Sequence, residues 1–135
     1  MKCVDRLRPW LTMVLLAHLA ACGPFPGPPP PLTVAAARQT LEEWNPVYVK
    51  VVEFYGLHYP GQGEVRLAYA AIINPTQAQP KPLVYEARFQ LLTRPDGRRQ
   101  WFLTSLITHS AGLSRRQGWD NILVPVKGEG AKPGS

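Results

Sequence analysis

The thiol of Cys22 is the side chain in this sequence with the clearest chemical potential. It closes the stretch Leu19-Ala20-Ala21-Cys22 at the end of an apolar run, and Gly23 follows it. A cysteine thiolate is the side-chain nucleophile that can accept a thioether-linked group. Whether that chemistry is used depends on the residues that precede Cys22.

Residues 1–21 have the three parts of a secretory signal. Three basic residues among the first eight outweigh the single Asp5, and the run from Trp10 to Ala21 is mostly apolar, with no acid, lysine or arginine. Small residues then lead to the cysteine. An apolar run of about a dozen residues is shorter than the roughly 20 that a spanning helix needs. The Gly-Pro-rich flank cannot extend it as a helix.

These residues resemble the lipobox of bacterial lipoproteins, which has Leu three positions before the cysteine, a small residue directly before it and often a small residue after it. The resemblance implies cleavage before Cys22, a diacylglyceryl thioether on its sulfur and, in many bacteria, acylation of the new amino group. Two or more acyl chains anchor a protein stably. The implied location is the cell envelope, at the periplasmic face of the outer membrane in a diderm host, because Gly23 is not Asp. An ordinary signal peptide with a nearby cysteine and an uncleaved anchor are the alternatives.

Five arginines form a second group with binding chemistry, because a guanidinium fork suits phosphate and carboxylate groups. Three of the five lie in the turn at 93–98 and its flank, and the other two lie in a Gly/Ser/Gln-containing loop at 112–118. The loop at 112–118 follows the strand that returns from the hairpin tip, so it is expected at the opposite end of the sheet from that tip. Two separate anion-binding or partner-binding patches are therefore predicted. Keeping the loops soluble is the alternative role. The residues are Arg94, Arg98, Arg99, Arg115 and Arg116.

The other polar residues predict no catalytic or metal site. His58 and His109 are the histidines left after processing, whereas a metal site usually needs three or four spaced ligands. Ser110 directly follows His109, and adjacent strand residues face opposite ways, so these two side chains are not expected to contact each other as nucleophile and base. No Gly-x-Ser-x-Gly motif is present. We therefore expect no enzymatic activity, no metal and no cofactor beyond a covalent lipid on Cys22.

Charge and cysteine content narrow the class of partner. The chain has 15 basic and 9 acidic residues, and 12 and 8 remain without the first 21. This positive excess suits an anionic membrane surface or envelope polymer, or simply keeps the protein soluble. No arginine-rich run or aromatic motif favours nucleic acid as a partner. With Cys3 removed and Cys22 modified, no internal disulfide can form.

Proline placement and periodicity indicate the first elements that must position these groups. Residues 22–32 read as the lipidated cysteine and a Pro-rich linker, which favours polyproline II. Residues 33–45 predict a helix that Thr33 caps and Pro46 ends. Its apolar face comprises Val34, Ala37, Leu41 and Trp44.

From Pro46 onward, period-two alternation predicts strands. The turn at 93–98 predicts a hairpin, and Pro125 places the last strand at a sheet edge. The return strand is apolar on both faces, with Trp101, Leu103 and Ile107 on one and Phe102 and Leu106 on the other, which suggests a central strand. The expected strands are 47–52, 65–73, 83–91, 100–109 and 121–126.

Residues 33–126 can bury one modest core, so we expect a single α+β domain followed by a loose tail at 127–135. One N-terminal helix packed on a curled antiparallel sheet of four to five strands is the simplest arrangement, and a small β-sandwich with a peripheral helix is the alternative. The order of elements resembles cystatin-like folds. The Gln-Val-Val-Ala-Gly motif of the inhibitory family is absent, since the corresponding loop at 58–63 reads His-Tyr-Pro-Gly-Gln-Gly. Protease inhibition is therefore not expected.

Two functions fit these features. The first is a non-enzymatic binding module or accessory subunit of an envelope assembly, tethered to the membrane by lipid, which meets a protein partner through a sheet edge or the arginine loops. Aromatic residues are common interface anchors, and Trp101, Trp119, Tyr48 and Tyr55 offer this role or a packing role. The second is a small-ligand carrier or enzyme with an apolar pocket between helix and sheet. Its lining would be Tyr69, Tyr85, Phe89, Trp101 and Leu103, with His109 or Glu86 as polar groups. The sequence leaves the oligomeric state open.

Overall fold

A computed structural model describes residues 28–29, 31–61, 63–108 and 117–127. The signal segment, Cys22, His109, Arg115, Arg116 and the end of the tail lie outside the described residues. The elements, in chain order, are helix α2 (Val34–Trp44) and strands β1 (Lys50–His58), β2 (Val65–Ile73), β3 (Leu83–Thr93), β4 (Arg99–Thr108), β5 (Gln117–Trp119) and β6 (Val124–Pro125).

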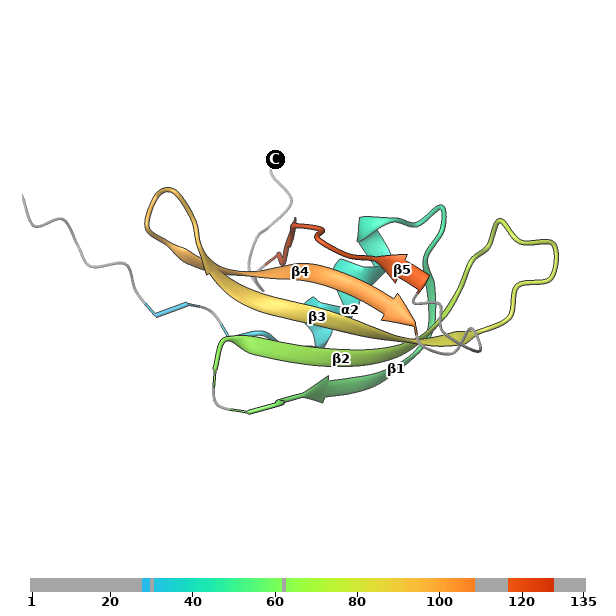
Figure 1. The fold of residues 1–135 in the computed structure, drawn as a ribbon, viewed down its shortest axis with the longest axis horizontal. Coiled ribbons are helices and arrows are strands. Elements are labelled where there is room, and N and C mark those ends of the chain that lie inside the picture. Colours follow the sequence, from blue (N-terminus) through green and yellow to red (C-terminus); the bar gives the residue numbers. More distant parts are fainter. Residues whose placement is uncertain (1–27, 30, 62, 109–116, 128–135) are drawn as a thin grey trace, which may run out of the picture.

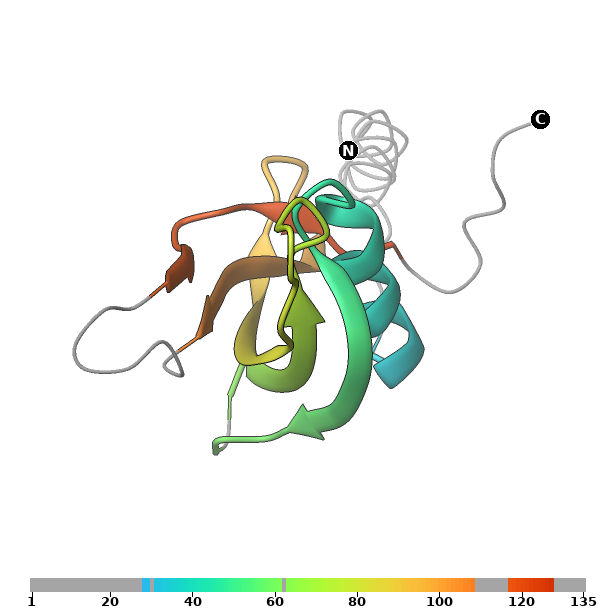
Figure 2. The same cartoon turned by 90° about the vertical axis from the view of Figure 1, so that its right-hand side faces the viewer.

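The described strands form a single antiparallel sheet that curls around the helix (Figures 1 and 2). The strands follow the order β1-β2-β3-β4-β5, and β6 also pairs with β4. The expected α+β architecture of one helix on an antiparallel sheet is therefore confirmed, with five to six strands in place of four to five. The sandwich alternative is wrong, because the described strands belong to one sheet.

The last predicted strand, 121–126, is shortened to β6, and β5, which the sequence did not predict, precedes it along the same edge of β4. β5 pairs with Leu106–Thr108 and β6 with Phe102–Leu103. Asn121, with a φ of 55°, lies in the link between them. Pro125 lies in β6 at the sheet edge, where its missing N–H is tolerated, as the sequence predicted.

Helix α2 begins and ends where local signals place its boundaries. The Thr33 side chain accepts a hydrogen bond of 3.1 Å from the Ala36 N–H, which caps the first turn. Ala37 and Leu41 are fully buried, as their spacing predicted. Val34 is half exposed instead, and Leu32, just before the helix, occupies the core in its place.

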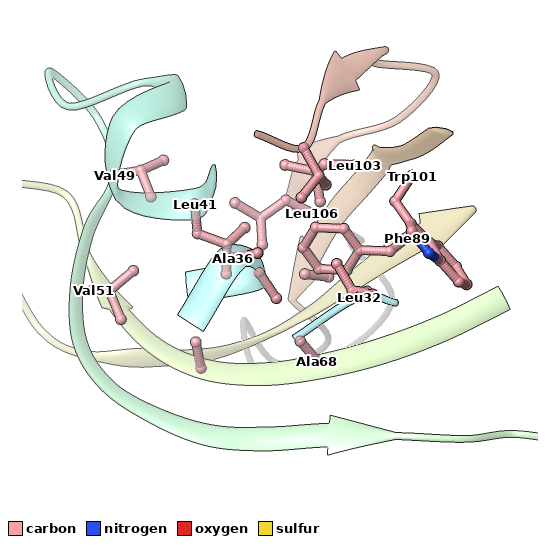
Figure 3. Packing of buried hydrophobic residues seen from close by; sticks show 14 of the residues in the cluster. Leu32, Ala36, Leu41, Val49, Val51, Ala68, Phe89, Trp101, Leu103 and Leu106 are labelled. Atoms are coloured by element: carbon pink, nitrogen blue, oxygen red, sulfur yellow. The ribbon is translucent and has the colours of Figure 1, made fainter. Parts of the chain in front are cut away.

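The core fills the space between the helix and the concave face of the sheet (Figure 3). Leu41 projects from α2 toward a group of sheet residues formed by Phe89, Leu103 and Leu106, all of which are fully buried. Small alanines on the middle strands, Ala68 among them, let the helix approach the sheet closely. The helix and the sheet therefore form one packed body.

Strand β1 does not follow the predicted alternation. Pairing with β2 skips from Val51 to Glu53 and from Phe54 to Gly56, so Val52 and Tyr55 are bulge residues. Each bulge adds one residue to the strand and increases its local bend. The residues that face the core in consequence recur every three positions, at Val51, Phe54 and Leu57. The bulges also help the sheet to curl around α2.

The predicted start of the first strand is wrong by three residues. Residues 46–48 form a turn, closed by a hydrogen bond of 2.8 Å from the Val49 N–H to the Asn45 oxygen. Val47 is therefore exposed, whereas Val49 is buried. Pro46 stops the helix, but the chain must still reverse before it can pair with β2.

Strand β4 also departs from strict alternation, because Thr104 is an extra residue between Leu103, which pairs with Phe89, and Ser105, which pairs with Arg88. The bulge moves Leu106 onto the same face as Leu103. Ile107 is on the opposite face, so the predicted grouping of Ile107 with Trp101 and Leu103 is wrong.

Candidate functional site

The predicted pocket between helix and sheet does not assemble from its expected residues. Phe89 and Trp101 are buried in the core cluster, and Tyr85 packs against it. Tyr69 pairs across β2 and β3 with Glu86 and therefore lies on the other face of the sheet from Phe89. Its hydroxyl donates a 3.1 Å hydrogen bond to Glu86 Oε2. Tyr69 and Glu86 thus form a polar pair on the outer face.

Three hollows lie at the surface of the described chain. One of about 170 Å³, mainly apolar, separates the last turns of α2 from β6, with Thr40, Trp44 and Val124 in its lining. A second, of about 450 Å³, is open and polar and lies on the outer face of the sheet, between Arg88 and the 120–123 segment. A third, of about 480 Å³, is also open and lies between the end of α2 and the start of β1, beside Pro75. None is lined by the residues of the expected pocket. Within the described ranges, no three His, Cys, Asp or Glu side chains are close enough to hold a metal ion.

The titration of Tyr85 follows from its place at the edge of the core. Burial raises the pKa of the Tyr85 hydroxyl above its ordinary value of about 10. The pKa of Tyr69 is raised as well, first by burial and then by the hydrogen bond and negative charge of Glu86. Both groups favour the neutral phenol in the folded state, so the folded protein holds these protons to higher pH than the unfolded chain.

We therefore expect the free energy of unfolding to fall as the pH rises above about 10, through the raised pKa values of these two tyrosines. Below pH 10 this contribution is fully present. Tyr85→Phe should make the fall less steep, because phenylalanine has no proton to lose. Urea unfolding of both proteins between pH 8 and pH 11 measures the slopes. Equal slopes would contradict this assignment to Tyr85.

The first candidate surface is the arginine end, which comprises Arg66, Arg94, Arg98 and Arg99. It lies where the turn between β3 and β4 and the loop between β1 and β2 reach the same end of the sheet (Figure 1). The turn has the predicted form, with the Gly97 N–H bonded to the Arg94 oxygen at 2.9 Å and a φ of 81° at Gly97. Local turn chemistry therefore presents Arg94 and Arg98.

Two of these four arginines are engaged in holding the end of the sheet together. Arg66 stacks over Tyr59, with its Cζ 4.5 Å from the ring centroid, and over Trp101 at 5.3 Å. It also donates to the Gly63 and Val65 oxygens at 2.7 Å each. Arg99 forms an ion pair with Glu64. These contacts fix the β1–β2 loop against the β3–β4 hairpin.

The other two arginines are at the hairpin tip and remain more available. Arg94 donates a 3.0 Å hydrogen bond to Gln100 and is 4.0 Å from Asp96, with half of its side chain exposed. Among the described residues, the Arg98 guanidinium has no hydrogen-bond partner; only its backbone N–H bonds to Asp96. Arg94 and Arg98 are thus the members of this end that can bind an outside anion. Arg115 and Arg116 lie outside the described residues, so the second predicted arginine patch stays a prediction.

The second candidate surface is the β1 strip, which comprises Val47, Tyr48, Val52, Tyr55 and Tyr59. These are five of the eight large hydrophobic residues that the described part of the chain exposes, and they are 49–60% exposed. β1 is the edge strand of the sheet. Tyrosines with exposed rings are enriched at protein interfaces. The β1 strip therefore has the composition of a protein-binding surface.

Sequence reasoning named Tyr48 and Tyr55 as possible anchors but did not identify the strip. The strip could have been predicted from the spacing of Val51, Phe54 and Leu57. If these three residues face the core, Val52 and Tyr55 must face outward. Trp101 is buried and Trp119 packs edge-on against Trp44 at 5.2 Å, so both serve in packing.

The chain was compared with protein-family models, with curated proteins and with solved structures. No match was found in any of the three. In the part of the chain that the structure describes, no helix has both the length and the apolar character needed to cross a membrane.

Proposed function

We propose that this protein is a lipid-anchored component of a bacterial cell envelope that acts as a non-enzymatic binding module, holding a partner protein at the membrane. The anchor would be a lipid on Cys22, which the Leu19-Ala20-Ala21-Cys22 stretch supports. The binding surface would be the β1 strip. The observation that carries the binding role is the run of exposed apolar side chains on this edge strand and on the residues directly before and after it.

The two bulges in β1 indicate how the partner binds. Strand addition to a sheet edge needs a regular row of backbone donors and acceptors. Bulges at Val52 and Tyr55 interrupt that row, and bulged edges are a common device against unwanted strand pairing. The same bulges turn two apolar side chains outward. Contact through side chains, with tyrosines as anchors, therefore suits this edge better than a continuous added strand.

The alternative function, a small-ligand carrier or enzyme, would need a cavity between α2 and the sheet. Leu41, Phe89 and Leu106 fill this space and are fully buried. The hollow of about 170 Å³ between α2 and β6 is not lined by these core residues, and the two larger hollows are open to solvent. A binding surface on the outside of a packed core is the simpler arrangement.

Site-specific photocrosslinking in living cells tests the binding role. A photoreactive amino acid replaces Val52 or Tyr55 on the β1 strip, and Arg88, which is exposed on the outer face of β3, is the matched control position. We expect one and the same envelope protein to crosslink from both strip positions and not from position 88. Equal crosslinking from all three positions, or none from the strip, would reject the β1 strip as the surface.

Binding of the recovered partner should depend on the tyrosine rings of the strip. Truncation of an interface tyrosine commonly weakens binding by about tenfold or more. Tyr48→Ala combined with Tyr55→Ala should therefore weaken the purified pair about a hundredfold, measured by calorimetry. Neither ring is in the core, so the fold should be unaffected.

A further inference from the structure

The chain joins the domain at the arginine end. Leu32 is buried beside Phe89 in the core cluster (Figure 3), and the strands that carry Phe89 and Trp101, β3 and β4, meet at the turn of the arginine end. The described residues that precede Leu32 extend outward beyond that end of the sheet (Figure 1). About ten residues separate Cys22 from Leu32, and such a length of chain spans at most roughly 35 Å. A lipid on Cys22 would therefore hold this end of the domain close to the bilayer.

The arginine end has the charge to contact an anionic bilayer. Its four arginines face two acids, Glu64 and Asp96, which leaves a formal excess of two positive charges. By contrast, one loop at the opposite end of the sheet, 74–82, has a single charged residue, Lys81. The ion pair between Arg99 and Glu64 cancels one charge of each sign, and Arg66 is held by internal contacts. The hairpin tip, with Arg94 and Arg98 against Asp96, therefore presents a net charge of one positive unit.

We propose that the arginine end is a second membrane contact, in which Arg94 and Arg98 bind the phosphates of anionic lipid headgroups and Tyr59 enters the same interface. This inference rests on the proposed lipid anchor. Guanidinium forks pair with phosphate oxygens, and tyrosine places an apolar ring and a polar hydroxyl at a membrane boundary. The short tether raises the local concentration of lipid at these side chains, so weak contacts suffice.

This contact would set the direction of the β1 strip. β1 begins at Lys50 and runs to His58 beside the arginine end, and Tyr59 follows. Val47 and Tyr48 lie before the start of the strand, at the other end of the strip. With the arginine end on the bilayer, the strip would point outward from the membrane, with Tyr59 nearest the lipid. A partner would then bind along an edge of fixed orientation.

Nitroxide labels at the two ends of the sheet test the contact. With Cys22 lipidated, the mature chain has no free thiol, so Pro95→Cys at the hairpin tip and Gln79→Cys in the 74–82 loop each provide one labelling site. The lipidated proteins are placed in nanodiscs of phosphatidylglycerol or phosphatidylcholine. Power-saturation spectroscopy then measures collisions with oxygen, which enters lipid, and with a nickel complex, which stays in water.

We expect the label at position 95 to collide more with oxygen and less with nickel in phosphatidylglycerol than in phosphatidylcholine, and the label at position 79 to be unchanged. Each basic residue near an anionic surface is worth about a factor of five. Arg94→Gln with Arg98→Gln should thus reduce the contacting population on the order of twentyfold. The matched pair Lys50→Gln with Lys81→Gln should not reduce it, and 0.5 M salt should weaken the contact.

The outcomes separate this inference from the anchor on which it rests. The mass of the mature protein shows whether Cys22 carries lipid; an unmodified thiol would remove the anchor and the inference together. A lipidated protein whose position-95 label remains water-exposed in both lipids would overturn the membrane contact alone. Retention on an anionic polymer without any response to phosphatidylglycerol would also overturn it.

Discussion

Replacing Phe89 with alanine should lower the free energy of unfolding by about 3–5 kcal/mol. Phe89 is fully buried at the centre of the only core that the described residues form, where it meets residues from α2, β4 and the linker. Truncation would leave a cavity on the concave side of the curled sheet. The shape of this sheet is already constrained by its β-bulges and by packing against the helix. Since small domains are stable by about 5–15 kcal/mol in total, this variant should be close to unfolding at 37 °C.

Urea unfolding, followed by circular dichroism, measures the effect. Phe89→Leu keeps most of the volume and should cost less than about 1.5 kcal/mol, so it remains measurable if the alanine variant does not fold. Phe102→Ala is the matched control, because Phe102 neighbours Leu103 but faces the outer side of the sheet and is partly exposed. Equal losses for Phe89→Ala and Phe102→Ala would contradict the placement of the core.

Replacing Cys22 with alanine should abolish lipid attachment completely. The proposed linkage is a thioether, and alanine has no sulfur to form it. Cells given an alkyne fatty acid should label the wild-type protein and leave Cys22→Ala unlabelled. The variant should therefore lack the modified mature N-terminus that we expect mass spectrometry to detect in the wild type, and without acyl chains it should lose its anchor.

The other cysteine provides the control for this experiment. Cys3 lies within the segment that processing would remove, so Cys3→Ala should incorporate fatty acid as the wild type does. Equal labelling of Cys22→Ala and the wild type would place any lipid elsewhere. A wild-type protein without label would remove the anchor from the proposed function while leaving the β1 strip to be tested by crosslinking.

The parts of the fold that depend on local signals could be predicted from the sequence. The Thr33 cap and Pro46 set the ends of α2 correctly, and the Pro-Asp-Gly sequence at 95–97 specified the β3–β4 turn. The arginines of this turn could be identified for the same reason. The resemblance to a lipobox concerns residues outside the described part of the chain and stays a prediction.

The parts that depend on bulges could not be predicted from alternation alone. A bulge changes which face each later residue occupies, and its position depends on pairing with a strand distant in the sequence. The bulge at Thr104 places Ile107 on the face opposite Leu103 in this way. The bulges at Val52 and Tyr55 interrupt the alternation in β1. Tyr69 was assigned to the wrong side of the sheet because the apolar residues of β2 occupy both of its faces. The outward positions of Val52 and Tyr55 in the β1 strip result from these bulges, so the strip became visible only in three dimensions.

The burial of Leu32 has a mechanical consequence. If the chain is anchored at Cys22 as proposed, a pull on it reaches Leu32 before the first turn of α2. Its side chain is wedged in the cluster with Phe89 and Trp101, so the force passes into packed side chains and is shared with β3 and β4. The helix is thereby shielded from being unwound from its free end.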